Sequence, residues 1–437
     1  MSNNKKISVI TLGCSKNTVD SERLMNQIRL NNFNLIDNPN NAETVIINTC
    51  GFIEAAKEES VNTILNAVAL KKEGKIKKVI VAGCLSERYK SELEKEIPEV
   101  DMFFGTEKYE GIINSLGGKL KSELLGERFL TTPSHTAYLK ISEGCDHPCS
   151  FCAIPIMRGK HKSVPMENLI REAEFLARNN TKEIILIAQD TTDYGIDIYG
   201  QKYLSTLLNN LSEIKEIEWI RLMYAYPSQF PDDVIDTIAA NAKICKYVDI
   251  PLQHISDIVL KSMRRGVTGK RTRELLLKLR ANIPGITLRT TFITGYPNET
   301  EKEFEELCNF IKEIKFDRIG VFTFSVEENT SSFILGDPVP EKAKQKRKEI
   351  LMEIQKEISI EKNKEFIGKK LKVLIEGTEG DFFVSRSFRD APEVDGEVLI
   401  PVNGANLNAG DFYDVEITGA NEYDLFAKLV KINGSEA

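Results

Sequence analysis

Over the first quarter of the chain, short apolar runs of strand type alternate with longer stretches that carry apolar residues at helical spacing. This alternation is typical of βα units. We therefore predict an α/β domain over residues 1–125, built on an open parallel sheet of flavodoxin-like size. The predicted strand and helix pairs are Ile7–Leu12 with Asp20–Leu30, Thr44–Asn48 with Ala55–Leu70, and Val79–Ala82 with Arg88–Lys95.

A second βα series is expected over residues 131–365. Six strand-like runs can be counted there, two fewer than in a closed eight-fold barrel. The count predicts a partial (β/α)6 barrel that is open on one side. The expected strands lie near Tyr138–Ser142, Glu183–Ala188, Trp219–Tyr224, Tyr247–Pro251, Thr287–Ile293 and Ile319–Phe324.

The pattern changes again in the last quarter of the chain. Lys342–Phe366 is densely charged and lacks Gly and Pro, which predicts one amphipathic helix ending near Gly368. Alternating β runs separated by Gly, Asn and Asp then predict a small all-β barrel over residues 366–434. These runs are Leu371–Ile375, Phe382–Ser385, Glu397–Val402, Tyr413–Ile417 and Leu425–Val430.

Composition narrows the class of protein. A chain of 437 residues with 41% hydrophobic content can bury a substantial core divided among two to four domains. The formal net charge of −7 disfavours a general affinity for nucleic acid and suits a basic protein partner. The first apolar run is too short for a secretory or membrane segment, so we expect a cytoplasmic location.

Three of the eight cysteines share one loop after the first predicted barrel strand. Cys145, Cys149 and Cys152, here called the barrel triad, have CxxxCxxC spacing. Three thiolates on one loop can hold a four-iron four-sulfur cluster and leave one iron open, and that iron could bind S-adenosylmethionine (SAM). A structural zinc site is the alternative, although His147 is poorly spaced to be its fourth ligand.

Three other cysteines recur at equivalent places in the N-terminal series. Cys14, Cys50 and Cys84, here called the N-terminal triad, each follow a predicted strand beside a glycine. Because neighbouring parallel strands end on one edge about 5 Å apart, these thiols can converge on a second cluster. The alternative is that they are buried small apolar residues. Cys245 and Cys308 lack this context and are expected to be core or surface thiols.

Polar residues follow several other predicted barrel strands, on the face where barrel active sites are built. We expect contacts to SAM from them, with a structural role as the alternative for each. His254 could equally be a structural histidine, and no general acid or base is identifiable beyond the clusters. The predicted SAM contacts are Phe151, Gln189, Asp190, Arg221, Gln253, Arg289 and Gly295.

Together these motifs resemble the methylthiotransferase family of radical SAM enzymes, over nearly the whole chain. The resemblance implies a C-terminal TRAM domain, two 4Fe–4S clusters, and two SAM molecules per turnover. The cluster of the barrel triad would cleave SAM to a 5'-deoxyadenosyl radical. The cluster of the N-terminal triad would carry the sulfur, which a second SAM methylates.

Three segments resemble one branch of that family, RimO, which modifies an aspartate of small-subunit ribosomal protein S twelve. They are Thr11–Glu22, Pro155–Gly159 and Ala188–Gly195, while Val164 departs from the usual Arg-Pro pattern. Residues 366–437 hold seven basic and thirteen acidic residues, which suits a basic ribosomal protein better than RNA phosphates.

The branch resemblance implies methylthiolation of the aspartyl β-carbon, in the free ribosomal protein or in the subunit. An electron donor such as flavodoxin or ferredoxin and a sulfur donor are the further expected partners, with no membrane. A tRNA adenosine methylthiotransferase and a non-catalytic iron–sulfur sensor remain the alternatives.

Overall fold

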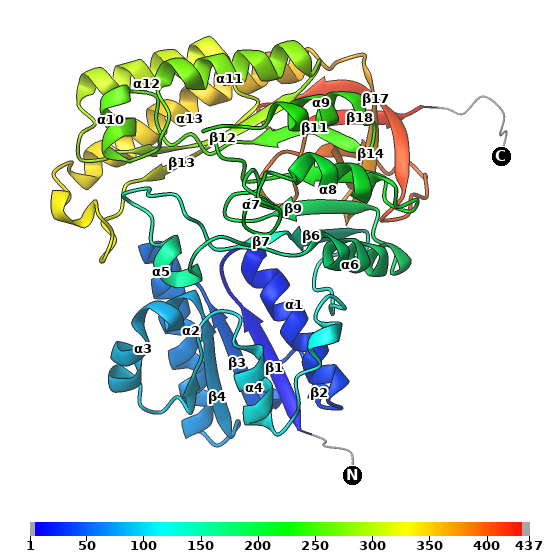
Figure 1. The fold of residues 1–437 in the computed structure, drawn as a ribbon. Helices are drawn as coiled ribbons and strands as arrows, with labels where there is room; N and C mark the ends of the chain where they lie inside the picture. The colour runs from blue at the N-terminus through cyan, green and yellow to red at the C-terminus, as the bar shows by residue number, and fades with distance from the viewer. Residues whose placement is uncertain (1–4, 431–437) are drawn as a thin grey trace.

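The computed structural model of the protein describes residues 5–430, which form two parallel sheets, a two-stranded hairpin and a closed β-barrel (Figure 1). This architecture confirms the predicted fold class. We propose the predicted domain limits of 1–125, 131–365 and 366–434, of which residues 1–4 and 431–434 lie outside the described residues. None of the helices in residues 5–430 is both long and apolar enough to cross a membrane.

The N-terminal sheet has five parallel strands in the order β2-β1-β3-β4-β5, and its buried centre is β1, β3 and β4, as predicted. The helices predicted from Asp20 and Arg88 begin earlier, at Ser15 and Cys84; the first turn of the helix from Ser15 carries only polar residues, which hide the helical period. The elements are β1 (Lys6–Thr11), α1 (Ser15–Leu30), β2 (Asn34–Leu35), β3 (Thr44–Thr49), α2 (Glu54–Lys72), β4 (Lys78–Gly83), α3 (Cys84–Glu96), β5 (Met102–Phe103) and α4 (Tyr109–Leu116), with 3-10 turns at Pro39–Asn41 and Ser122–Leu124.

The central sheet has six parallel strands in the order β13-β12-β11-β10-β9-β6, so it is the open partial barrel that the strand count predicts. A short antiparallel hairpin, β7 with β8, was not predicted. The strands are β6 (Thr136–Lys140), β7 (Ser142–Glu143), β8 (Lys162–Ser163), β9 (Glu183–Ile187), β10 (Trp219–Leu222), β11 (Ile244–Asp249), β12 (Thr287–Thr294) and β13 (Arg318–Thr323). The helices are α5 (Ile154–Arg158), α6 (Met166–Arg178), α7 (Ile196–Tyr199), α8 (Leu204–Ser212), α9 (Asp232–Ala240), α10 (Asp257–Ser262), α11 (Gly269–Asn282) and α12 (Glu301–Ile314), with a 3-10 turn at Phe333–Leu335.

Alternate residues of the central strands serve two different cores. Ile184 and Leu186 pack with the surrounding helices in the largest apolar cluster. Ile185 and Ile187 point to the other face, where they share a cluster with Val19 of α1 and Leu374 of the C-terminal barrel. The inner face of the partial barrel is therefore packed against both other domains, as strand alternation allows.

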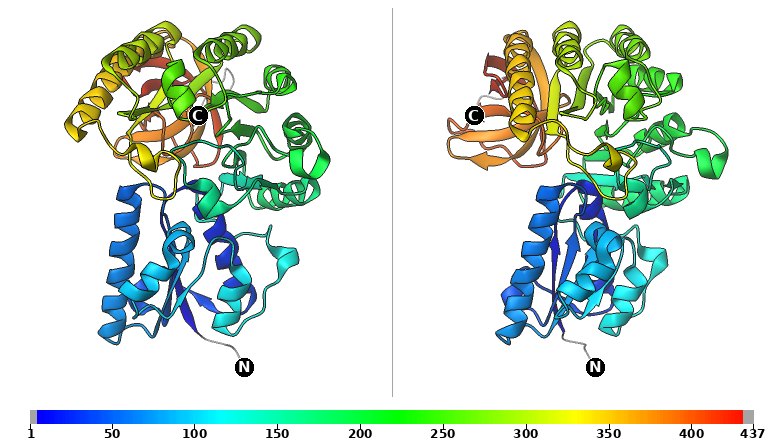
Figure 2. Two further views of the ribbon diagram at one scale, coloured as in Figure 1. Left: turned by 60° about the vertical axis from the view of Figure 1, so that its left-hand side comes forward. Right: turned by 90° about the vertical axis from the view of Figure 1, so that its left-hand side faces the viewer.

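A long helix, α13 (Glu341–Lys364), packs on β13 at the edge of the central sheet and leads into the C-terminal barrel. The barrel closes in the order β14-β15-β16-β18-β17, which confirms the five predicted strands. Figure 2 shows the N-terminal domain at one end of the molecule and the C-terminal barrel beside the central domain at the other. The strands are β14 (Lys370–Glu379), β15 (Phe382–Ser387), β16 (Val398–Pro401), β17 (Phe412–Ala420) and β18 (Leu425–Leu429).

Candidate functional site

Strand register brings the N-terminal triad to one edge of its sheet. Thr11 pairs with Asn48 on β3, and Thr49 pairs with Gly83 on β4, so the residues that follow the three strand ends are neighbours. Close approach depends on glycine: a Cβ added at Gly13 would lie 2.7 Å from the Cβ of Cys50. The structure thus brings together the three cysteines that the pattern singled out.

Cys14 and Cys84 also lie at the N-terminal ends of α1 and α3, where a helix favours anionic groups.

Gly83 offers a direct test of this packing. Its φ of +96° and ψ of −162° suit glycine alone, and an added Cβ would lie 2.6 Å from the Thr49 carbonyl oxygen. We expect Gly83→Ala to destabilise the protein by about 2–5 kcal/mol, because backbone strain and overpacking add. It should also halve bound iron, measured by iron analysis beside urea unfolding. Gly74→Ala is the matched control, since Gly74 has φ +75° but no atom within 4 Å of an added Cβ. Equal effects of both substitutions would contradict the packing argument.

The barrel triad lies on the loop between β7 and α5. The β7–β8 hairpin pins the start of this loop, and the Cys145 amide donates to the Gly159 carbonyl at 3.1 Å. The Ser150 amide donates to the Met263 carbonyl at 2.9 Å, which ties the middle of the loop to the end of α10. The loop is therefore fixed at both places by backbone hydrogen bonds.

The distances among the thiols help to distinguish a site for an iron–sulfur cluster from a site for a single zinc ion. All eight cysteines are free, and in residues 5–430 no three side chains that include a cysteine sulfur offer ligand atoms within 4.8 Å of one another. Tetrahedral zinc with bonds of about 2.3 Å needs sulfurs roughly 3.8 Å apart. Neither triad is therefore gathered closely enough to form such a zinc site, whereas a four-iron cubane holds its thiolate ligands farther apart.

Burial favours the protonated form of Cys84, Cys145 and Cys152 when no metal is bound. It raises the pKa of Cys145 and Cys152 to about 12 each. Burial also raises the pKa of Cys84 to about 12, against the opposing effect of the Arg158 guanidinium. Iron that binds these sulfurs must displace their protons, so cluster assembly should weaken as the pH falls.

Helix α5 connects the two triads. It begins two residues after Cys152, and Ala153 and Met157 pack directly against Cys84 in one buried cluster. At the end of this helix the Nε of Arg158 donates to the Cys84 sulfur at 3.3 Å. Cys84 of the N-terminal triad therefore lies against the segment that follows the barrel triad, at the boundary between the N-terminal and central domains.

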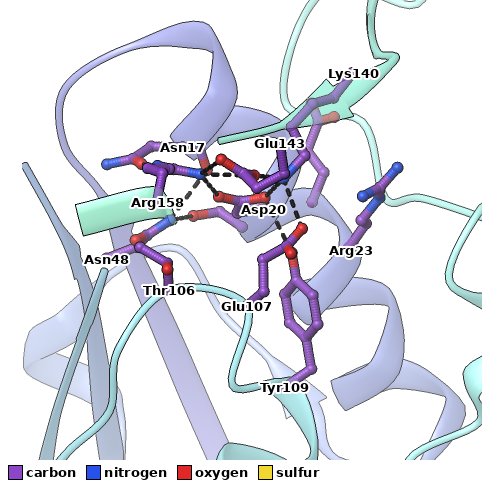
Figure 3. A network of polar contacts seen from close by, with 12 residues as sticks. Asn17, Asp20, Arg23, Asn48, Thr106, Glu107, Tyr109, Lys140, Glu143 and Arg158 are labelled. Carbon is purple, nitrogen blue, oxygen red and sulfur yellow. Dashed lines mark hydrogen bonds and ion pairs between the residues drawn. The ribbon is translucent and has the colours of Figure 1, made fainter. Parts of the chain in front are cut away.

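A buried polar network surrounds Arg158 (Figure 3). Its Nη1 atom contacts Asp20 at 2.8 Å and Glu143 at 3.0 Å, and its Nη2 atom donates to Asn17. The Lys140 ammonium binds both acids from the other side. Burial alone would raise the pKa of Asp20, but Lys140 and Arg158 outweigh it and hold that pKa far below the usual value.

Sequence reasoning did not assign roles to these network residues. The available signal was their position in the segments Thr11–Glu22 and Pro155–Gly159, which hold Asn17, Asp20 and Arg158.

The surroundings of Cys149 were also missed. Arg265 donates to the Cys149 sulfur at 3.3 Å, and the Tyr226 hydroxyl lies 3.6 Å from the same atom. His147 of the loop stacks on Tyr226 with ring centroids 3.6 Å apart. No sequence motif marks Arg265 or Tyr226, because each belongs to a different βα unit and meets the loop only in the folded chain.

Three of the predicted SAM contacts lie beside the barrel triad. Gln189 donates to Glu143 at 2.8 Å, and its own side-chain oxygen is buried with no partner among residues 5–430. Asp190 accepts from Thr192 at 2.7 Å and lies 2.6 Å from His147 of the cysteine loop. Phe151 packs on the apolar cluster that contains Tyr296. The unpartnered oxygen of Gln189 leaves a polar group free for a ligand.

Two of the predicted contacts have structural partners elsewhere in the fold. Arg221 is fully buried and turned toward the C-terminal barrel, where it donates to Glu183 at 2.8 Å and to the Phe388 carbonyl at 2.7 Å. The Gly295 amide donates to Glu299 at 2.9 Å, and an added Cβ would collide with Lys344 of α13. Both residues therefore have structural partners in this fold, and as SAM contacts they stay predictions.

The remaining polar candidates for SAM contacts already have some partners within the protein. Arg289 pairs with Asp249 at 2.9 Å. Gln253 has φ +74°, and its backbone N–H donates to the Thr291 carbonyl. We retain both as proposed SAM contacts. His254 is fully buried against Glu299 at 3.2 Å, which fits the structural alternative.

Comparison with known families covers most of the chain. The model described as "Uncharacterized protein family UPF0004" matches residues 6–105, and the Radical SAM superfamily matches residues 139–311. The TRAM domain matches residues 367–430. Each match coincides with one of the three parts of the fold.

Full-length relatives are named Ribosomal protein uS12 methylthiotransferase RimO. The relative from Cytophaga hutchinsonii is 51% identical over 98% of this chain and 98% of its own length. The relative from Christiangramia forsetii is 52% identical over 98% of this chain and 95% of its own. The radical SAM methyltransferase TsrM from Kitasatospora setae has a similar fold, with TM-score 0.57 and 13% identity over 86% of this chain and 79% of that one.

Proposed function

Because this chain belongs to the RimO family of radical SAM methylthiotransferases, we propose that its barrel triad and its N-terminal triad each hold one 4Fe–4S cluster. The observation that carries this proposal is the packing of Cys84 against Ala153, the residue directly after Cys152, and against Met157 of α5. It puts the residue that follows the barrel triad in contact with the N-terminal triad. A radical made at one cluster then has a short route to sulfur held at the other.

The enzyme adds a methylthio group to carbon, and we propose that its substrate is the β-carbon of an aspartate in ribosomal protein uS12. When bound, the clusters and two SAM molecules supply the electron, the 5'-deoxyadenosyl radical and the methylated sulfur. A reduced donor such as flavodoxin or ferredoxin and a sulfur donor complete the set of proposed partners.

The residues of the chain hold and orient these groups. Backbone hydrogen bonds from Cys145 and Ser150 fix the cysteine loop, so the cluster position does not depend on loop motion. Gln189, Asp190 and Phe151 border the loop and are the proposed contacts to SAM. Cys50 and Cys84 are buried whereas Cys14 is exposed, so water is kept from only one side of the N-terminal triad and its other side can be reached from outside.

Charge supports a basic protein as the substrate. Residues 366–437 hold seven basic and thirteen acidic residues, a formal charge of −6, and could steer a lysine- and arginine-rich protein to the enzyme. A surface that neutralises RNA phosphates would have the opposite sign.

The test is to incubate the reduced, cluster-loaded enzyme with SAM and either uS12 or tRNA. We expect 5'-deoxyadenosine and a mass gain of about 46 Da on a uS12 aspartate, the value for replacing H by SCH3. Modified tRNA with unchanged uS12 would replace the proposed substrate by the tRNA alternative. Absence of 5'-deoxyadenosine would favour the iron–sulfur sensor.

A further inference from the structure

One cysteine of each triad receives a hydrogen bond from a buried arginine. Arg158 donates from Nε to Cys84, and Arg265 donates from Nη1 to Cys149, each at 3.3 Å. Both guanidinium groups are almost completely shielded from solvent. Buried cations that point at ligand sulfur are in a position to act on whatever charge the sulfur carries.

The two arginines differ in how their charge is balanced. The far side of Arg158 is held by Asp20 and Glu143, so two carboxylates already compensate its charge. In residues 5–430 no carboxylate pairs with Arg265, whose other neighbours are the Tyr226 ring face at 4.3 Å and the Pro251 carbonyl. Within the same residues, the Nε of Arg265 is buried without a hydrogen-bond partner. A buried cation without an acidic partner is costly, so negative charge at the barrel triad would stabilise it.

This difference has a consequence for electron transfer. Reduction adds one negative charge to an iron–sulfur cluster, and hydrogen bonds to the ligand sulfurs are one way in which a protein sets the reduction potential. A guanidinium beside the sulfur stabilises the reduced state more than the oxidised state, and it does so more strongly when no carboxylate offsets it.

We propose that Arg265 and Arg158 are positioning residues that separately raise the reduction potentials of the barrel-triad cluster and the N-terminal-triad cluster, with the larger effect from Arg265. This inference rests on the proposed function, because it requires a cluster at each triad. It assigns to two residues outside the cysteine motifs the task of keeping the two clusters at different potentials.

The test is a redox titration of the cluster-loaded enzyme, followed by electron paramagnetic resonance. Variants that keep a single cluster identify the two signals, because Cys84→Ala should retain only the cluster of the barrel triad and Cys149→Ala only the cluster of the N-terminal triad. We expect Arg265→Gln to lower the potential of the barrel-triad cluster by at least the equivalent of a tenfold change in its reduction equilibrium, ~59 mV for one electron. The other cluster should keep its potential. Arg158→Gln should lower only the potential of the N-terminal-triad cluster, and by less.

Three controls keep the result interpretable. Arg265→Lys and Arg158→Lys retain the charge, so they should give smaller shifts in the same direction, and they carry the test if a glutamine variant loses its cluster. Arg23→Gln breaks a buried ion pair between domains, Arg23 with Glu172 at 3.0 Å, that involves no cysteine, and it should move neither potential.

Unchanged potentials in fully loaded arginine variants would overturn the inference, as would equal shifts of both clusters in either variant. Iron and sulfide analysis of the unaltered enzyme separates this failure from failure of the proposed function. An enzyme that binds no cluster at one of its triads would overturn both.

Discussion

Replacing Cys84 by alanine is expected to abolish methylthio transfer while SAM cleavage continues. Cys84 belongs to the N-terminal triad, so its loss removes the sulfur-carrying cluster but leaves the loop of Cys145, Cys149 and Cys152 intact. The barrel triad is tied by its own backbone hydrogen bonds to Gly159 and Met263, which the substitution does not touch. Bound iron should fall from about eight to about four atoms per chain. Mass spectrometry of uS12 and chromatography of 5'-deoxyadenosine measure the two activities.

Cys149→Ala is the reciprocal variant. It should abolish both 5'-deoxyadenosine formation and methylthio transfer, because the radical precedes sulfur capture. Cys308→Ala is the matched control, since this half-buried thiol of α12 belongs to neither triad and should leave both activities unchanged. Methylthio transfer by the Cys84 variant would show that the N-terminal triad is not the sulfur site.

Glu183→Ala is expected to destabilise the protein by about 3–5 kcal/mol, since it leaves two buried arginines without their shared acid. Glu183 is fully buried at the start of β9, 2.8 Å from Arg221 and 2.6 Å from Arg386 of the C-terminal barrel. Urea unfolding measures the loss. Glu218→Ala is the matched control at the same interface, because Glu218 pairs with Lys372 in a half-exposed bridge and should cost less than about 1 kcal/mol. Similar losses in both variants would contradict the argument.

The Glu183 carboxylate also makes the stability of the protein depend on pH. Burial would raise the pKa of Glu183, but Arg386 and Arg221 outweigh it and lower that pKa below its usual value. Its stabilisation is therefore present above the unfolded pKa of about 4.3 and is lost as the pH falls through the lower folded value. The difference in unfolding free energy between the unaltered protein and Glu183→Gln should be largest near neutral pH and shrink below about pH 4.

The cysteine triads show how far sequence can predict a site. The barrel triad could be predicted because its CxxxCxxC spacing lies within one loop. The N-terminal triad could be predicted because the strands of one parallel sheet end on the same edge. Arg265 and Tyr226 could not be found this way, since neither spacing nor strand position relates them to Cys149. The partners of Arg221 could not be predicted for a similar reason. Glu183 and the Phe388 carbonyl meet its guanidinium only because the C-terminal barrel covers this part of the central sheet.

The sequence by itself determined the three architectures, the six cysteines and the family, because alternation of apolar residues and short-range spacing are local properties of the chain. Only the tertiary structure decided how the domains meet: α5 against Cys84, Arg158 between Asp20 and Glu143, and Glu183 beneath the C-terminal barrel. Apart from the pair of Arg158 with Glu143, which are 15 positions apart in the central domain, these contacts join residues of different domains. Their energies come from burial and charge compensation, which no single segment of the chain contains.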